Sequence, residues 1–151
     1  MKRLLLAVLV AFFASAPVAR AGQPIRAPIQ VLPSFHAVCG YFVGTNPLEQ
    51  DRVATLYSDG RQTDTGKLVV RVTHLDGDGS KSIVLDVSGP LFFTVNADGS
   101  RTVEGTGNTL WVVDDAIYLV RGEATLVIEP NGTSTTFSSV GYIENLCETL
   151  A

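Results

Sequence analysis

The sequence contains few of the residues on which most enzymes and metal sites depend. Its 151 residues include only two cysteines, two histidines and one tryptophan. The cysteines do not form a Cys-x-x-Cys redox pair, and no Gly-x-Ser-x-Gly nucleophile elbow is present. Metal sites need more ligands than one cysteine pair supplies. We therefore predict no catalytic residues, no cofactor and no metal site, and we expect a binding protein rather than an enzyme.

Hydrophobic runs long enough to span a bilayer comfortably are also lacking. The apolar run from Leu4 to Ala14 follows Lys2 and Arg3 and precedes the small-residue cleavage pattern Ala19-Arg20-Ala21. This order is typical of a secretory signal peptide. We predict that residues 1–21 are removed and that the protein is secreted, without stable membrane insertion.

Basic charge is scarce once that segment is gone. Three of the 11 basic residues lie in residues 1–21, which leaves 8 basic residues against 15 acidic ones and a formal charge of −7. Nucleic-acid and anionic-lipid binding need a basic patch, which scattered lysines and arginines do not provide. Nucleic acid is therefore excluded as an expected partner.

The two cysteines are placed for a structural disulfide. Cys39 lies near the start of the expected domain and Cys147 lies close to its end. A secreted chain reaches an oxidising environment, in which such a pair is normally bridged. We predict a Cys39–Cys147 disulfide, which closes a loop of about 109 residues and restricts the unfolded chain.

The remaining chain alternates short apolar, β-branched runs with turns. The turns recur at Asp59-Gly60, Asp76-Gly77, Asp78-Gly79, Asp98-Gly99 and Asn131-Gly132. Period-two alternation predicts strands at 35–44, 51–57, 67–75, 81–88, 91–96, 101–106, 109–114, 117–129 and 133–143. Residues 22–34 contain three prolines and are predicted to be an extended, poorly ordered leader. Residues 35–151 are predicted to form a single β-domain.

Short connections between successive hairpins favour an antiparallel up-and-down meander of about eight or nine strands. A sheet of that size with one apolar face must curl or pack against a second sheet. We predict an all-β fold that forms a closed or nearly closed barrel, with a two-sheet β-sandwich as the alternative. Gly105, Gly122 and Gly141 are expected at sharp corners of the sheet.

A weak repeat at an offset of 33 residues predicts that two turns have the same geometry. The repeat aligns Asp98-Gly99 with Asn131-Gly132, and each of these pairs follows a run of alternating apolar residues. Pro130 fixes φ near −65°, which is incompatible with a type I′ turn. We predict a type I turn closed by a left-handed Gly132, and the same turn at Asp98-Gly99.

The alternation also assigns side chains to the core and to a candidate site. The predicted core contains Leu68, Val70, Ile83, Leu85, Phe93, Val95, Leu126 and Ile128. Aromatic residues usually fill cores, but Phe93, Trp111 and Tyr118 are also the candidate ligand-binding residues at a barrel mouth.

His36 and His74 are not predicted to be catalytic, because each lies near a strand end or a turn without an evident orienting partner. A catalytic triad of His74 with Ser80 or Ser82 is the alternative.

The run Asp76-Gly77-Asp78-Gly79-Ser80 begins like a calcium-binding loop. Lys81 stands where such a loop needs glycine, so a plain hairpin turn is predicted instead.

Several turns and strand ends also resemble a known group of proteins. These are Thr65-Gly66-Lys67, the run from Ser82 to Pro90, Asp98-Gly99-Ser100 and Asn145-Leu146-Cys147. Together they resemble a group of small secreted bacterial all-β proteins without an assigned function. The resemblance implies a similar β-domain and bridge, and it transfers no catalytic residue.

These observations predict a secreted, non-catalytic β-barrel binding module for a small apolar ligand or an extracellular partner. The alternatives are a structural or interaction protein of the cell envelope or matrix, and a barrel-type cyclase or isomerase. A hollow interior would favour a ligand or a reaction. A filled interior with exposed aromatic side chains would favour binding to another protein.

Overall fold

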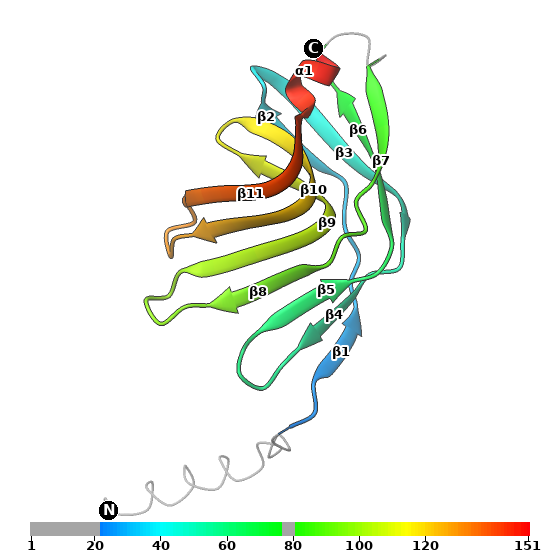
Figure 1. Ribbon diagram of the computed structural model, residues 1–151. Coiled ribbons are helices and arrows are strands. Elements are labelled where there is room, and N and C mark those ends of the chain that lie inside the picture. Colours follow the sequence, from blue (N-terminus) through cyan, green and yellow to red (C-terminus); the bar gives the residue numbers. More distant parts are fainter. Residues whose placement is uncertain (1–21, 77–80) are drawn as a thin grey trace, which may run out of the picture.

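The computed structural model describes residues 22–76 and 81–151 (Figure 1). The predicted signal peptide and residues 77–80 of the predicted hairpin turn lie outside the described residues. The strands are β1 (Ile25–Pro28), β2 (Ser34–Val38), β3 (Tyr41–Gln50), β4 (Val53–Leu56), β5 (Gln62–Thr65), β6 (Leu68–His74), β7 (Ser82–Asp86), β8 (Leu91–Val95), β9 (Arg101–Val113), β10 (Ala116–Ile128) and β11 (Ser134–Asn145), and the helix is α1 (Leu146–Leu150).

The strands form two antiparallel sheets. One has seven strands in the order β1-β4-β5-β8-β9-β10-β11, and the other has four in the order β2-β3-β6-β7. The predicted all-β class and antiparallel pairing are confirmed. In the described residues the seven-stranded sheet ends at β1 and β11, which do not pair with each other, so the predicted closed barrel is not found. The two-sheet alternative fits this arrangement.

Both sheets come from a single meander of seven long strands, of which the first four are bent. β1 continues into β2, β3 into β4, β5 into β6 and β7 into β8. Hydrogen bonds continue through the bends: the Asp51 N–H donates to the Lys67 carbonyl at 3.1 Å, and the Val87 N–H donates to the Leu68 carbonyl at 2.8 Å. Each bent strand contributes one half to each sheet. This explains how an up-and-down order produces two sheets instead of a barrel.

One cross-strand glycine pair in the seven-stranded sheet brings the backbones of two strands into close contact. Gly122 and Gly141 are cross-strand partners in β10 and β11, with φ values of 151° and 113°. A Cβ on Gly122 would lie 2.1 Å from the carbonyl oxygen of Val140. Both positions therefore require glycine, as predicted. Gly105 has a different role, because a Cβ there would lie 2.7 Å from the ring of Trp111.

The hairpin turns of this sheet repeat one geometry. Gly99 and Gly132 have φ values of 85° and 87°, and the N–H of each donates to the carbonyl three residues earlier, at 3.0 and 2.8 Å. Oδ1 of Asp98 and Oδ1 of Asn131 each accept from the backbone N–H two residues later at 2.9 Å. The prediction that these two turns are equivalent is confirmed. The turn at Asp59-Gly60 has the same hydrogen bonds.

Several strands differ from the prediction. β5 (Gln62–Thr65) was not predicted, and β3 continues to Gln50, beyond the predicted end at residue 44. Cys39 and Gly40 both have positive φ, 63° and 74°, and form a tight turn that divides the predicted strand 35–44 into β2 and β3. β9 runs unbroken through the gap expected between 106 and 109. Residues Ile25–Pro28 are extended, as expected of the leader, but they pair with β4 and therefore belong to the seven-stranded sheet.

The core has two clusters, which lie on opposite faces of β10. The first contains Val38, Val43, Val70, Val72, Val87, Ile117, Leu119, Leu146 and Leu150, and the second contains Val103, Trp111, Val113, Val120, Ala124 and Leu126. Of the predicted core, Val70 and Leu126 are buried, and Leu68, Ile83, Leu85, Phe93 and Ile128 are half-buried. The prediction for Val95 is wrong. It is 61% exposed because it lies at the end of β8, next to a turn and beyond both clusters.

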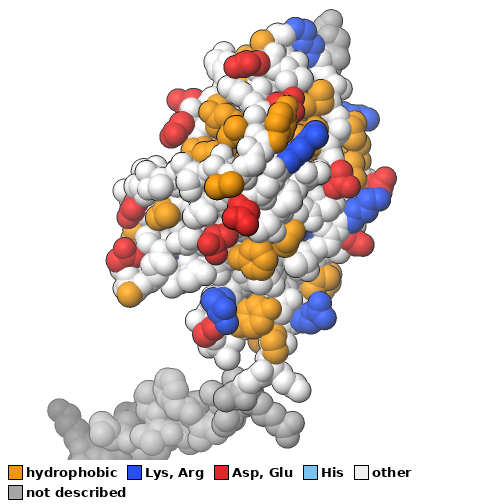
Figure 2. All heavy atoms as spheres, viewed as in Figure 1, with side chains coloured by type: hydrophobic (Ala, Val, Ile, Leu, Met, Phe, Trp, Pro, Cys, Tyr) orange, Lys and Arg blue, Asp and Glu red, His pale blue; other side chains and the backbone are white. Residues whose placement is uncertain are grey.

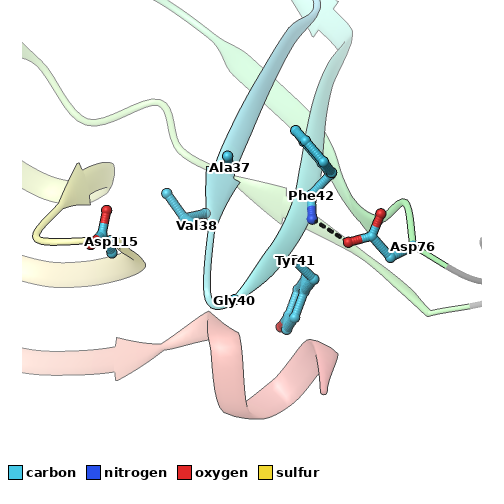
Figure 3. Close-up of a pocket in the computed structure, with 7 residues that line it drawn as sticks. All are labelled: Ala37, Val38, Gly40, Tyr41, Phe42, Asp76 and Asp115. Carbon is cyan, nitrogen blue, oxygen red and sulfur yellow. Dashed lines mark hydrogen bonds between the residues drawn. The ribbon is translucent and has the colours of Figure 1, made fainter.

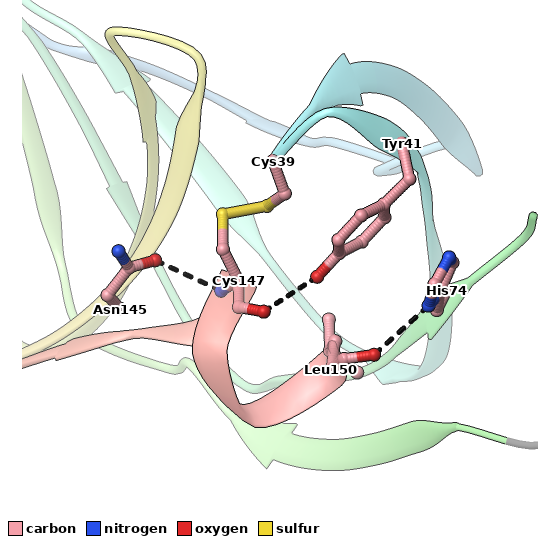
Figure 4. Close-up of a disulfide and its surroundings, with 6 residues drawn as sticks. All are labelled: Cys39, Tyr41, His74, Asn145, Cys147 and Leu150. Carbon is pink, nitrogen blue, oxygen red and sulfur yellow. Dashed lines mark hydrogen bonds between the residues drawn. A yellow bond between two sulfur atoms is a disulfide. The ribbon is translucent and has the colours of Figure 1, made fainter.

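The helix α1 closes one end of the four-stranded sheet (Figure 4). The predicted Cys39–Cys147 disulfide is present, with a Cα–Cα distance of 5.2 Å. Tyr41 Oη donates to the Cys147 carbonyl at 2.8 Å, and Asn145 Oδ1 caps the helix by accepting from the Cys147 N–H at 3.0 Å. No helix in residues 22–76 and 81–151 is long and apolar enough to cross a membrane.

Candidate functional site

The three aromatic residues predicted for a ligand pocket share one packed cluster. Phe93, Trp111 and Tyr118 all belong to the second core cluster. Trp111 is 5% exposed, its Nε1 donates to Oγ1 of Thr109 at 2.7 Å, and its ring centroid lies 5.8 Å from that of Phe137. The rings of Tyr118 and Phe137 stack at 5.9 Å. Because its polar atom is satisfied and its ring is packed, we assign Trp111 to the core.

His74 has a partner that the sequence did not reveal. Its Nδ1 donates to the carbonyl of Leu150 at 3.0 Å, and its ring stacks on Tyr41 with centroids 3.9 Å apart. In the pairing of β6 with β7, Ser82 is opposite the residue before His74 and so lies on the other face of the sheet. The alternative triad of His74 with Ser82 therefore does not form. Ser80 lies outside the described residues.

His36 contacts a hydroxyl but lacks the rest of a catalytic arrangement. Its Nε2 lies 3.0 Å from Oγ of Ser34, which is itself 2.6 Å from Oγ1 of Thr45. A serine activated by histidine also needs a group that orients the imidazole. Among the hydrogen bonds of the described residues, no carboxylate contacts His36. The geometry is that of a small polar cluster on β2 and β3.

Arg52 is a buried charged residue that the sequence analysis did not single out. It lies in the bend between β3 and β4, is 4% exposed, and its Nη2 donates to the backbone carbonyl of Asp64 at 3.0 Å. Burial lowers the pKa of the Arg52 guanidinium, and the negative charge of Asp64 opposes this shift. The pair links two neighbouring strands at the bend.

The outer face of the four-stranded sheet carries exposed aromatic side chains. Phe35 is 71% exposed and Phe42 is 53% exposed. In the register of β2 and β3, Phe35 is opposite Gly44 and Ala37 is opposite Phe42. The two phenylalanines are therefore diagonal neighbours on one face, within reach of each other. Val43, which points to the other face, is fully buried, so the phenylalanines are on the solvent side.

Leu75 extends this apolar surface. It is 40% exposed, and its N–H donates to the carbonyl of Phe42 at 2.8 Å. Its side chain lies over Gly44, where a Cβ would be 3.2 Å from it. The missing side chain of Gly44 thus leaves room for Leu75 beside the two rings. We refer to Phe35, Ala37, Phe42, Gly44 and Leu75 as the outer aromatic face.

A pocket of about 370 Å³ lies at the end of this face, next to the turn between β2 and β3 (Figure 3). It is lined by Ala37, Val38, Gly40, Tyr41, Phe42, Asp76 and Asp115. Oδ2 of Asp76 accepts from the Phe42 N–H at 2.7 Å, which fixes its carboxylate at the backbone of Phe42. The Cys39 N–H donates to the Asp115 carbonyl at 2.6 Å, which ties two hairpin turns together at the pocket.

The lining of this pocket combines apolar side chains with two carboxylates and no basic side chain. Burial raises the pKa of the Tyr41 hydroxyl, so this group stays protonated and donates to the Cys147 carbonyl. On the face shown in Figure 2, both acidic and basic side chains lie among exposed hydrophobic ones, so the absence of a basic side chain is particular to the lining of the pocket. Such surroundings favour a ligand group that is cationic and partly apolar.

The chain matches no known family model, no curated protein and no solved structure.

The outer aromatic face was missed because the turn at Cys39-Gly40 was missed. In one continuous strand, Phe35 and Phe42 would alternate onto opposite faces. The two-residue turn reverses the chain and brings them onto the same face. The signal that could have revealed it is Gly40, which stands between two apolar runs and next to a cysteine that the bridge holds in place.

Proposed function

We propose that the mature chain is a secreted, non-catalytic binding domain that recognises a polypeptide through its outer aromatic face. The partner segment places an apolar side chain against Phe35 and Phe42 and a lysine or arginine beside Asp76. The observation that carries this proposal is the exposure of two neighbouring phenylalanines, 71% and 53%, on one sheet face. Exposed apolar patches of this kind mark interaction surfaces, and aromatic residues are enriched in them.

The charge of the chain supports a basic partner. Asp76 and Asp115 line the pocket beside Phe42, and the predicted mature chain has a net charge of −7. Complementary charge increases the rate of encounter and selects against acidic partners. A carboxylate next to an aromatic ring suits the aliphatic stem and the charged end of lysine or arginine.

The pocket volume favours a side chain over a whole ligand. About 370 Å³ is near the lower end of the range for small-molecule sites, roughly 300–1,000 Å³. The cyclase or isomerase hypothesis loses support because it depends on a closed barrel. A structural or interaction role in the cell envelope or matrix would use the same outer aromatic face, and it stays the alternative.

A random peptide library displayed on phage tests the proposal directly. The library is selected on the mature domain and counter-selected on Phe42→Ser. The matched control is Val95→Ser, because Val95 is 61% exposed but lies on β8, away from the outer aromatic face. Asp76→Asn removes the charge and keeps an oxygen that can accept from the Phe42 N–H.

We expect enriched peptides that combine an aliphatic or aromatic residue with lysine or arginine. Their affinity should be equal for the wild type and Val95→Ser, at least about tenfold lower for Phe42→Ser, and lower for Asp76→Asn. Enriched peptides that bind Phe42→Ser as tightly as the wild type would contradict the proposal. So would a selection that enriches no peptide.

A further inference from the structure

The strand β11 is a long sheet edge that is exposed on both faces. It spans Ser134–Asn145, twelve residues, and within the described chain it pairs only with β10 (Figure 1). Every residue from Ser134 to Ile143 is exposed except Phe137, which is half-buried. The free side of the strand therefore presents unpaired backbone N–H and carbonyl groups over most of its length.

Proteins normally protect such an edge with lysine, proline or short strands. The other described sheet edges follow this rule, because β1 has four residues and includes Pro28, and β2 and β7 have five each. β11 contains no lysine, arginine or proline, and its single charged side chain is Glu144 near its end. A long edge strand with one charged side chain, near its end, can accept another strand.

Exposed apolar side chains concentrate on the same edge. Val140 is 73% exposed, Tyr142 is 55% exposed and Ile143 is 43% exposed. Val140 and Tyr142 point to one face of the sheet and Ile143 points to the other, so a strand added here would cover apolar surface on both faces. The guanidinium of Arg121 lies 5.5 Å above the Tyr142 ring and holds it against β10.

We propose that β11 pairs with β11 of a second copy of the chain, in antiparallel orientation about a two-fold axis. This pairing joins two seven-stranded sheets into one continuous sheet. The two-fold axis passes near Val140, so the valines of the two copies meet at the centre of the new strand pair. The two Glu144 side chains lie at opposite ends of the pair, whereas a parallel pairing would place them side by side.

The size of the contact predicts a weak dimer. Twelve residues of strand extend about 40 Å, and a sheet edge is about 10 Å thick, so the pair buries on the order of 800 Å² in total. This area is below the roughly 1,200–2,000 Å² of stable specific interfaces and within the range of weak, transient ones, so the dimer should depend on concentration. The outer aromatic face belongs to the other sheet and stays free in the dimer.

Sedimentation equilibrium of the mature protein between roughly 10 and 500 µM tests the pairing. We expect the mass to rise from that of a monomer toward twice that value. Val140→Lys should remain monomeric, because it places two like charges side by side at the axis. Ser138→Lys should weaken the dimer at least about tenfold, because a lysine on an edge strand opposes pairing with another strand. The control Val84→Lys should dimerise like the wild type, since Val84 is a 55% exposed valine on the edge strand β7. Circular dichroism confirms that each variant is folded.

A wild-type protein that stays monomeric over this range would overturn the proposal. Dimerisation of folded Val140→Lys and Ser138→Lys at the wild-type affinity would also overturn it, and so would assembly beyond the dimer. Sedimentation equilibrium does not depend on whether the domain binds peptides. The proposed function and the proposed dimer can therefore be refuted independently of each other.

Discussion

The imidazole of His74 and the carbonyl of Leu150 are joined by a 3.0 Å hydrogen bond across 76 residues of sequence (Figure 4). Together with the Cys39–Cys147 disulfide, this contact fixes α1 on the four-stranded sheet. The side chains of Leu146 and Leu150, the first and last residues of α1, are fully buried. The turn between β2 and β3, the two strands that carry most of the outer aromatic face, is thereby tied to α1. A surface that is held in place before binding loses less conformational freedom when it binds.

The disulfide should provide a large part of the stability of the domain. Cys39 and Cys147 are 108 residues apart, and the chain-entropy model gives about 4–5 kcal/mol for a loop of this length. The double variant Cys39→Ala, Cys147→Ala should lose up to this amount in urea denaturation. Thiol titration of the denatured, unreduced wild type should find no free thiol, and two reactive thiols would refute the bridge.

The glycine pair in β10 and β11 should tolerate no side chain. Gly122→Ala adds a Cβ 2.1 Å from the Val140 carbonyl oxygen at a φ of 151°, so we expect a loss of about 3 kcal/mol or more. Gly132→Ala is the control: its φ of 87° is also strained, but nothing lies within 4 Å, and about 1 kcal/mol is expected. If Gly122→Ala and Gly132→Ala lose the same free energy of unfolding in thermal or urea denaturation, close backbone contact is not the reason that position 122 requires glycine.

The register of the core can be tested with two apolar truncations. Leu119 is 2% exposed in the first cluster, and Leu119→Ala should cost roughly 2–5 kcal/mol. Val95 is 61% exposed, and Val95→Ala should change stability by less than about 0.5 kcal/mol. A larger effect at Val95 than at Leu119 in equilibrium denaturation would show that the faces of these strands are assigned wrongly.

The two equivalent turns, one with Asp98 and the other with Asn131, allow a test of how the domain responds to acid. Exchanging aspartate and asparagine changes the charge of the side chain and keeps its shape. The Ser100 hydroxyl and backbone N–H lower the pKa of Asp98, and Asn131 makes the same bonds in the other turn with an amide. Because the folded pKa lies below the unfolded value of about 3.9, the unfolded chain binds more protons as the pH falls through this range. The stability that Asp98 contributes is present above the unfolded pKa and is lost in acid.

Asp98→Asn should therefore reduce the slope of unfolding free energy against pH between about pH 4 and pH 2, and Asn131→Asp should increase it. Both variants keep the oxygen that accepts from the next-but-one N–H. Urea denaturation at several pH values measures the slope. If neither exchange alters it, the turn hydrogen bonds do not control the acid stability of the domain.

The local features of the fold were predictable because they depend on neighbouring residues. The type I turns at Asp98-Gly99 and Asn131-Gly132 follow from Pro130 and from glycine at the left-handed position. The cysteine pairing follows from there being only two cysteines. The bend between β5 and β6 was not predictable, because β5 (Gln62–Thr65) contains no apolar residue whose alternation could reveal a strand before the bend.

The outer aromatic face depends on tertiary structure in the same way. Leu75 joins Phe42 only because β6 pairs with β3, and Gly44 leaves room for it. The predicted ligand residues Phe93, Trp111 and Tyr118 did come together, but in a packed cluster. Sequence pattern indicates that a side chain is apolar, and the pairing of distant strands decides whether it is covered.

The most direct test of the account is to add one enriched peptide to the isotope-labelled domain and to record which backbone amide NMR signals shift. We predict that the amide signals of Phe35, Phe42 and Leu75 shift on binding, while those of Trp111 and Tyr118 stay unchanged in the core. Shifts confined to the cluster of Phe93, Trp111 and Tyr118, with the outer aromatic face unaffected, would contradict the account.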